Sequence, residues 1–133
     1  EKYLSYRTYH GCALGAHHQA ASALAWQDEA HVVENRQLYR DKFRAVSEIL
    51  SPHYNLSQPE GGFYHWLPTP IRDQEFSQRL LAEQHITVMP GSFLGRDTPQ
   101  GNPGHNHARI AWVAPFDECI QAAQRLAAFA QNL

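Results

Sequence analysis

The sequence predicts an α+β domain in which a small, mostly antiparallel sheet of about three strands has helices packed on one face. The chain has 133 residues, of which 43% are hydrophobic and 18% are charged, a composition typical of one folded globular domain. Its segments follow the order helix, helix, strand, helix, strand, strand, helix, which favours this layered arrangement. No period of about 20 to 50 residues repeats, so a solenoid is excluded.

The first part of the chain predicts two helices. Residues 12–28 are rich in Ala and Leu and carry little charge on any face, so we expect a helix that is largely buried. Residues 29–50 predict a longer helix, which Pro52 ends just after Ser51. Its helical stripe advances in alternating steps of three and four residues through Val32, Arg36, Tyr39, Phe43, Val46 and Leu50.

The middle of the chain predicts a strand, a short helix and a second strand. Residues 63–67 are rich in aromatic side chains and form the expected strand, which Pro68 closes. Asp73 is expected to be the N-cap of a helix that ends near Gln84. The apolar side of this helix is formed by Phe76, Leu80 and Leu81. Residues 86–89 predict the second strand.

The last part of the chain predicts a long loop, a strand and a helix. Residues 91–106 are rich in Gly, Pro and Asn, and a loop of this length inside a compact domain is usually functional or mobile. Residues 107–114 form the expected third strand, and residues 116–131 form the last helix. One face of this helix carries Phe116, Ile120, Ala123, Ala127 and Ala130.

Charge and cysteine content exclude several classes of function. The net charge is −2 and no basic stretch occurs, which disfavours nucleic-acid binding. The apolar stretches fall far short of the roughly 20 residues that a membrane span needs. Cys12 and Cys119 have no CxxC spacing, so we expect two buried thiols in a reducing, cytoplasmic setting rather than a disulfide framework.

Arg109 is the most informative single residue, because it interrupts an otherwise apolar strand. Alternation along a strand places His107, Arg109 and Ala111 on one face and their neighbours on the other. A charged group in the middle of a strand is costly to bury without a partner. Two interpretations stay open from the residue alone: an arginine that binds a substrate carboxylate in a bidentate manner, or a structural salt bridge to a nearby Asp or Glu.

The histidines suggest a metal site only weakly. His17 and His18 are adjacent in an expected helix, where neighbouring side chains diverge. His105 and His107 suit one face of a strand, but no spacing supplies a third ligand. No metal site is therefore expected.

Three motifs, in order, resemble a known family. They are residues 61–66 (GGFYHW), 88–95 (VMPGSFLG) and 108–111 (ARIA). They resemble the landmarks of the small C-terminal domain of class I/II, fold-type I aminotransferases, which use pyridoxal phosphate (PLP). The resemblance implies that residues 28–133 form this small domain, and that residues 1–27 form a segment packing on a large domain outside the chain.

A closer resemblance covers nearly the whole chain. The stretches that carry it are residues 6–13 (YRTYHGCA), 25–29 (AWQDE), 35–40 (NRQLYR) and 102–106 (NPGHN). They are similar to the bacterial succinyldiaminopimelate aminotransferases of lysine biosynthesis. This family implies a cytoplasmic homodimer that transfers an amino group between glutamate and the keto form of an N-succinylated diamino diacid.

The resemblance also implies roles for individual residues. The family's carboxylate-binding arginine falls on Arg109, and Arg7 and Tyr9 fall where related enzymes place residues that reach the partner subunit's active site. Packing at a dimer interface is the alternative for Tyr9. The family's Schiff-base lysine and its other cofactor-binding residues have no counterpart here, since Lys2 and Lys42 lie in different contexts.

These features predict a piece of a longer enzyme. The chain starts at Glu1 and its one methionine is Met89, so we expect a fragment, a processed chain or trimmed termini. Such a piece contains no catalytic, cofactor-binding or metal-binding residue, binds no PLP and is expected to be inactive alone. The alternative is a free-standing binding or interaction module that uses the same scaffold without catalysis.

Overall fold

The computed structural model describes residues 1–11 and 14–133, which divide into two compact units. The first unit covers Glu1–Arg36 and the second covers Gln37–Leu133, so the division falls inside one helix. The boundary expected at residue 27 concerns packing on a domain outside this chain and stays a prediction. No helix of the described residues is both long and apolar enough to cross a membrane.

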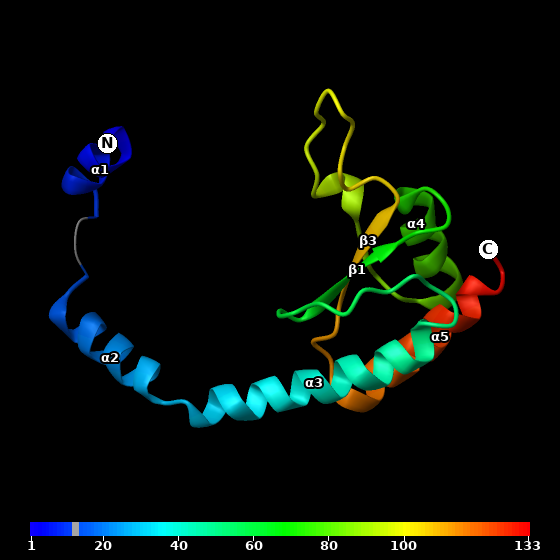
Figure 1. The fold of residues 1–133 in the computed structure, drawn as a ribbon, viewed down its shortest axis with the longest axis horizontal. Helices are drawn as coiled ribbons and strands as arrows, with labels where there is room; N and C mark the ends of the chain where they lie inside the picture. Colours follow the sequence, from blue (N-terminus) through cyan, green and yellow to red (C-terminus); the bar gives the residue numbers. More distant parts are fainter. Residues whose placement is uncertain (12–13) are drawn as a thin grey trace. The chain divides into compact units, whose positions relative to one another are not determined.

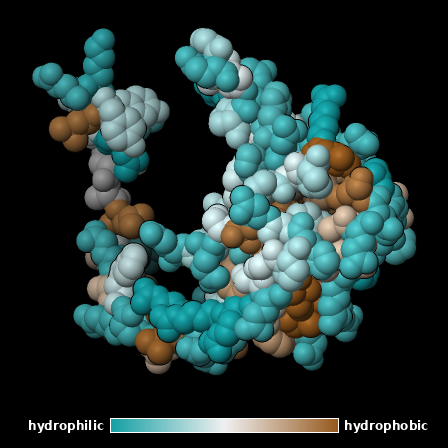
Figure 2. All heavy atoms as spheres, turned by 45° about the vertical axis from the view of Figure 1, so that its right-hand side comes forward, coloured by the Kyte–Doolittle hydropathy of each residue, from teal (hydrophilic) through white to brown (hydrophobic). Residues whose placement is uncertain are grey.

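The first unit is built from helices without a buried residue. Helix α1 spans Lys2–Tyr9, and α2 spans Ala16–Gln27. The expectation that the second of these helices is largely buried is wrong for this chain, because every described residue of α2 is exposed. In Figure 2, the brown hydrophobic residues on the left of the view are isolated patches among hydrophilic ones. The large exposed apolar residues of the unit are Tyr3, Leu4, Tyr6, Tyr9, Leu14, Leu24, Trp26 and Val33.

The helix predicted for residues 29–50 is confirmed as α3, which spans Ala30–Leu50, although Arg36 of its predicted stripe is exposed. Its C-terminal part contributes Phe43, Val46 and Leu50 to the hydrophobic core of the second unit. Lys42, one step from the stripe, donates hydrogen bonds to the carbonyl oxygens of Trp112 (3.2 Å) and Ala114 (2.5 Å). These bonds tie α3 to the chain that follows the central strand.

The second unit contains the predicted three-stranded antiparallel sheet, in the order β1-β3-β2. Strand β1 spans Tyr64–Pro68, β2 spans Met89–Pro90 and β3 spans His107–Ala111. Both outer strands end in proline, which edge strands tolerate because no neighbour needs the missing N–H. The second and third strands are shorter than predicted, since β2 pairs with β3 only at Met89–Arg109 and Pro90–Ala108.

Within the second unit, the helices lie on one face of this sheet, which confirms the predicted α+β class (Figure 1). Helix α4 spans Asp73–Gln84 and α5 spans Phe116–Ala130. The Phe76 and Phe129 rings meet edge to face at 5.5 Å, which joins these two helices. From the sheet, the side chains that enter the core are His65, Leu67, Ala108 and Ile110, followed by Trp112.

The buried faces of the helices differ in part from the predicted ones. Half of the Leu81 side chain is exposed, and so is nearly half of Phe116. Helix α5 buries Ala123 and Ala127 of the predicted face, together with Cys119, Leu126 and Phe129. Cys119 is a buried thiol whose pKa is raised by burial, whereas Cys12 lies outside the described residues. The buried face of α5 therefore lies beside the predicted face and shares Ala123 and Ala127 with it.

Asp73 is not the N-cap of α4, as the sequence suggested, but its first residue. The carboxylate is buried and accepts hydrogen bonds from the backbone N–H groups of Ser92 (2.9 Å) and Asn106 (3.3 Å). Burial acts to raise the pKa of Asp73, but the hydrogen bonds from Ser92 and Asn106 outweigh it and hold this pKa below 3.8. A charged Asp73 thus joins α4 to the segments after β2 and before β3.

Asp73→Asn is expected to lower the free energy of unfolding by about 1 to 3 kcal/mol, because one charged acceptor oxygen becomes an amide donor. The lowered pKa means that the carboxylate's contribution is present above about pH 4 and is lost as the pH falls through the folded-state pKa. Urea denaturation followed by circular dichroism measures the effect. Asp117→Asn, at an exposed position of α5, is the matched control and should change stability little.

His65 is a buried histidine held neutral by its surroundings. Its Nδ1 accepts a hydrogen bond from Trp112 Nε1 (2.8 Å), while its Nε2 is buried without a partner among the described residues. Burial lowers the pKa of His65 below its ordinary value of 6.5. Protonation would place a second hydrogen between Nδ1 and Trp112 Nε1, so the hydrogen bond requires the neutral ring.

The unfolding free energy is expected to fall as the pH drops from about 7 to about 5, because the unfolded His65 takes up a proton more readily than the folded one. In His65→Gln, which keeps an acceptor for Trp112 but does not titrate, this decline should be shallower. Urea denaturation at several pH values measures how steeply the unfolding free energy declines in each protein. His53→Gln, at an exposed turn, should keep the parent slope, and an equally steep decline in both variants would contradict the assignment.

Candidate functional site

Arg109 lies at the centre of the face of the sheet opposite the helices. We call this the open face, and it carries Tyr64, Trp66, Met89, His107 and Arg109. Arg109 pairs with Trp66 on one side and with Met89 on the other. Its guanidinium carbon is 5.8 Å from the centre of the Tyr64 ring. Two strands therefore present aromatic and thioether side chains around one half-buried cation.

No carboxylate of residues 1–11 and 14–133 forms an ion pair with Arg109. The ion pairs between described residues are His31–Asp28, Arg44–Asp41 and Arg79–Glu83. The salt-bridge interpretation of Arg109 therefore has no partner within the described chain. An arginine fork on a face without acidic side chains is suited to bind an anion with carboxylate geometry.

Trp66 and His107 form a flat stacked pair beside Arg109. Their rings are 5.5 Å apart and nearly parallel, at 12°. His107 Nδ1 lies 2.8 Å from the carbonyl oxygen of His105, which orients the imidazole. A side chain at Gly91 would collide with the edge of Trp66. The indole is thus fixed between a neighbouring strand and the turn that follows β2.

The loop over residues 91–106 is anchored at its base beside this pair. It begins with a 3₁₀ turn, η1, over Gly91–Phe93. Asn102 donates a hydrogen bond to the carbonyl oxygen of Ser92 (3.0 Å) and accepts one from the Gly104 N–H (2.9 Å). Gly91 and Gly104 approach so closely that a Cβ on either would overlap the other's backbone. Both ends of the loop are therefore held at the rim of the open face.

Arg7 and Tyr9 belong to the first unit, which the structure describes by itself. Both lie on α1, where Arg7 donates to the carbonyl oxygen of His10 (3.4 Å) and 83% of Tyr9 is exposed. The Tyr6 and His10 rings stack at 4.7 Å beside them. The structure brings Arg109 together with Tyr64 and Trp66, while the role expected for Arg7 and Tyr9 stays a prediction.

The histidines considered as metal ligands make other contacts. The rings of His17 and His18 lie 4.1 Å apart, so the expected divergence of these neighbours is wrong at the start of α2. His107 is stacked on Trp66. Within the described part of the chain, no group of three His, Cys, Asp or Glu side chains is arranged to hold a metal ion.

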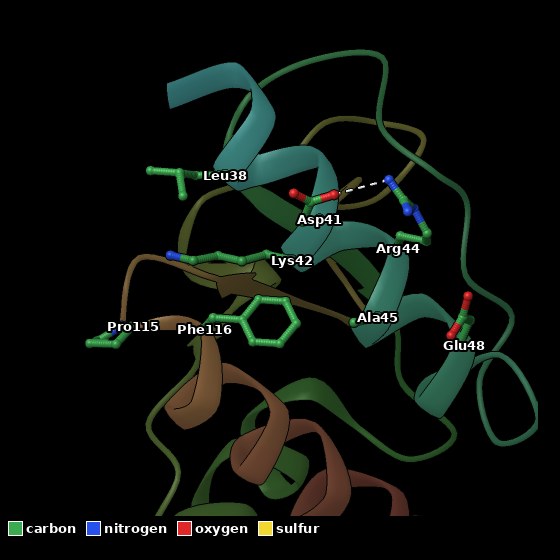
Figure 3. Close-up of a pocket in the computed structure, with 8 residues that line it drawn as sticks. All are labelled: Leu38, Asp41, Lys42, Arg44, Ala45, Glu48, Pro115 and Phe116. Carbon is green, nitrogen blue, oxygen red and sulfur yellow. Dashed lines mark hydrogen bonds and ion pairs between the residues drawn. The ribbon is translucent and has the colours of Figure 1, made fainter. Parts of the chain in front are cut away.

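The second unit also has an open hollow of about 650 Å³ between α3 and the start of α5 (Figure 3). Leu38, Ala45, Pro115 and Phe116 supply its apolar lining. The Asp41–Arg44 ion pair lies at its edge. None of the residues predicted for the functional site lines this hollow.

The two lysines of the chain differ in how available their amines are to a cofactor. Lys42 extends along the hollow, and its ammonium group is held by two carbonyl oxygens and lies 5.1 Å from the centre of the Tyr39 ring. Lys2 lies exposed on α1. A Schiff base needs an accessible amine close to a site that binds the rest of the cofactor. Lys42 does not meet this requirement in the structure, and the expectation that the chain binds no PLP stays a prediction.

Comparison with known proteins identifies the family. The sequence profile "Aminotransferase class I and II" matches residues 5–126. The chain belongs to the class I and II aminotransferase family. An aminotransferase of Neisseria meningitidis Z2491 has a crystal structure that matches 97% of this chain and 33% of its own, with 44% identity and a TM-score of 0.88.

Two further aminotransferases match this chain at lower sequence identity. The 4-dedimethylamino-4-oxo-anhydrotetracycline transaminase OxyQ of Streptomyces rimosus is 32% identical over 92% of this chain and 33% of its own length. A structure described as "probable N-succinyldiaminopimelate aminotransferase" from Thermus thermophilus is 31% identical, with a TM-score of 0.55, over 68% of this chain and 23% of its own. The chain spans about a third of the length of such relatives.

Treatment of the chain with PLP and borohydride is expected to label Lys42 much more slowly than Lys2, because two carbonyl oxygens hold the Lys42 ammonium. Peptide mass spectrometry after a time course measures both sites. Preferential, stoichiometric labelling of Lys42 would contradict the expectation that the chain lacks a cofactor lysine.

Sequence reasoning found Arg109 but missed the aromatic side chains that surround it. The alternation of residues 63–67 already places Tyr64 and Trp66 on the same face of a strand. What the sequence does not reveal is the register Trp66–Arg109, which brings this face of β1 beside the arginine.

Proposed function

We propose that this chain is the substrate-binding C-terminal domain of a PLP-dependent aminotransferase, in which Arg109 binds the α-carboxylate of the amino or keto acid. The observation that carries the proposal is a half-buried arginine on the open face without an ion-pair partner among the described residues. Membership of the aminotransferase family supports the same assignment.

The open face would orient the substrate as well as bind it. A bidentate carboxylate–guanidinium pair fixes both position and rotation of the carboxylate, and so directs the adjacent carbon away from Arg109. Trp66 and Met89, which flank Arg109 across the strands, offer apolar surface for the carbon chain beyond the carboxylate. The anchored loop over residues 91–106 borders this surface.

The proposed reaction is amino transfer between glutamate and the keto form of N-succinyl-diaminopimelate. The likeness to the Thermus thermophilus protein supports this substrate, in addition to the motifs of the sequence. PLP would be bound by a lysine outside residues 1–133, because neither Lys2 nor Lys42 suits that role. The chain alone is therefore expected to be inactive. We further propose a cytoplasmic homodimer in which Arg7 and Tyr9 recognise the distal part of the substrate.

In the intact enzyme, Arg109→Ala is expected to lower kcat/KM by roughly 10- to 100-fold, because a charged hydrogen bond contributes about 1.5 to 3 kcal/mol. Steady-state kinetics with both the amino donor and the keto acceptor measure the loss. Arg44→Ala, which breaks only an exposed ion pair with Asp41, is the control and should retain parental kinetics. An unchanged kcat/KM in Arg109→Ala would remove the basis of the proposal.

A further inference from the structure

The Tyr64 ring is the aromatic surface on which the Arg109 guanidinium lies. Across the two strands, Arg109 is paired with Trp66, and Tyr64 is paired with Ala111. The guanidinium carbon nevertheless lies 5.8 Å from the centre of the Tyr64 ring, within the range of a cation–π contact. The arginine side chain therefore reaches diagonally from its own strand partner toward Tyr64.

The neighbours of both aromatic residues favour this diagonal arrangement. One face of Trp66 is covered by His107, and its edge is enclosed by Gly91. The Tyr64 ring also contacts Phe63, whose ring meets it edge to face at 5.6 Å. Tyr64 remains 40% exposed, so its ring can support a cation that also faces a ligand.

An aromatic support and a carboxylate support have different consequences for a binding arginine. A carboxylate partner would occupy the N–H donors and neutralise the charge that a substrate needs. A ring contacts the flat face of the guanidinium and leaves the N–H groups at its edge available for a bidentate ligand. Arg109 has no ion-pair partner in the described part of the chain, so its donors are not committed to another side chain by an ion pair.

We propose that Tyr64 is a positioning residue for Arg109: its ring holds the guanidinium over the open face, with the N–H edge directed to the substrate carboxylate. The inference rests on the proposed function, because it requires that Arg109 binds that carboxylate. Tyr64 acts through Arg109 and restricts the motion of a long side chain before the substrate arrives, which reduces the entropy lost on binding.

Steady-state kinetics of the intact enzyme test whether the Tyr64 ring positions Arg109. Tyr64→Leu should raise KM for the carboxylate substrates roughly 3- to 10-fold with little change in kcat, as expected from the loss of a partly exposed cation–π contact. Tyr64→Phe keeps the ring and should retain the parental KM. Tyr64→Val, which suits an edge strand, is a second non-aromatic variant if Tyr64→Leu folds poorly.

A double-mutant cycle separates positioning from a general structural effect. In an Arg109→Ala background, Tyr64→Leu should cause no further increase in KM, because the group that it positions is gone. Arg79→Ala removes another arginine from an aromatic ring, that of Phe129 at 5.5 Å, and should leave KM unchanged. If Arg109→Ala has no effect, the proposed function fails. If Arg109→Ala weakens binding, the positioning role alone is wrong in two cases. In the first, Tyr64→Leu leaves KM unchanged. In the second, Tyr64→Leu raises KM by the same factor with and without Arg109.

A spectroscopic measurement on the chain itself gives a readout independent of activity. The Arg109 Nε–H proton should show an upfield ring-current shift in the NMR spectrum. That shift should persist in Tyr64→Phe and disappear in Tyr64→Leu. The same resonance position in all three proteins would overturn the proposed contact.

Discussion

The buried carboxylate of Asp73 is the constraint on which the arrangement of the open face depends. It sits at the first turn of α4, on the helix side of the sheet, and binds backbone N–H groups of two segments that are distant in sequence. One of these segments follows β2, and the other precedes β3. One buried side chain thereby links the backbone just after the edge strand to the backbone just before the central strand.

This constraint extends to the arginine without contacting it. Asn106, one of the residues bound by Asp73, adopts a left-handed conformation (φ 55°) immediately before β3. The backbone turn there determines the residue at which the strand begins, and a shift by one residue would exchange the two faces. Arg109 would then enter the core, and Ala108 or Ile110 would lie on the open face. The register of β3 therefore decides on which face of the sheet the cation lies.

Much of this organisation could be predicted from local patterns. The stripe through Phe43, Val46 and Leu50 identified the buried side of α3, and the alternation around Arg109 identified the two faces of β3. Both patterns reflect the fixed periods of helix and strand, which do not depend on the rest of the molecule. Motif order then led to the aminotransferase family, which the profile over residues 5–126 confirms.

Properties that depend on partners could not be predicted in this way. Asp73 has the residue type and position of a helix cap, but its hydrogen-bond partners are distant in sequence, so local reasoning assigned the wrong role. The Ala-rich α2 was expected to be buried, yet no described residue of the helix is, because apolar composition does not say which surface covers it. The contact between Tyr64 and Arg109 requires both the strand register and the diagonal reach of a long side chain.

Pro68 and Pro90, the last residues of the two outer strands, have a consequence for the behaviour of the chain in solution. A three-stranded sheet has two edges, and the unpaired N–H groups along an edge can pair with a strand from another molecule. Proline removes one such donor and restricts the backbone at the end of each edge strand. The small sheet is therefore a poor template for intermolecular β-pairing, which limits aggregation while its arginine-bearing face stays uncovered.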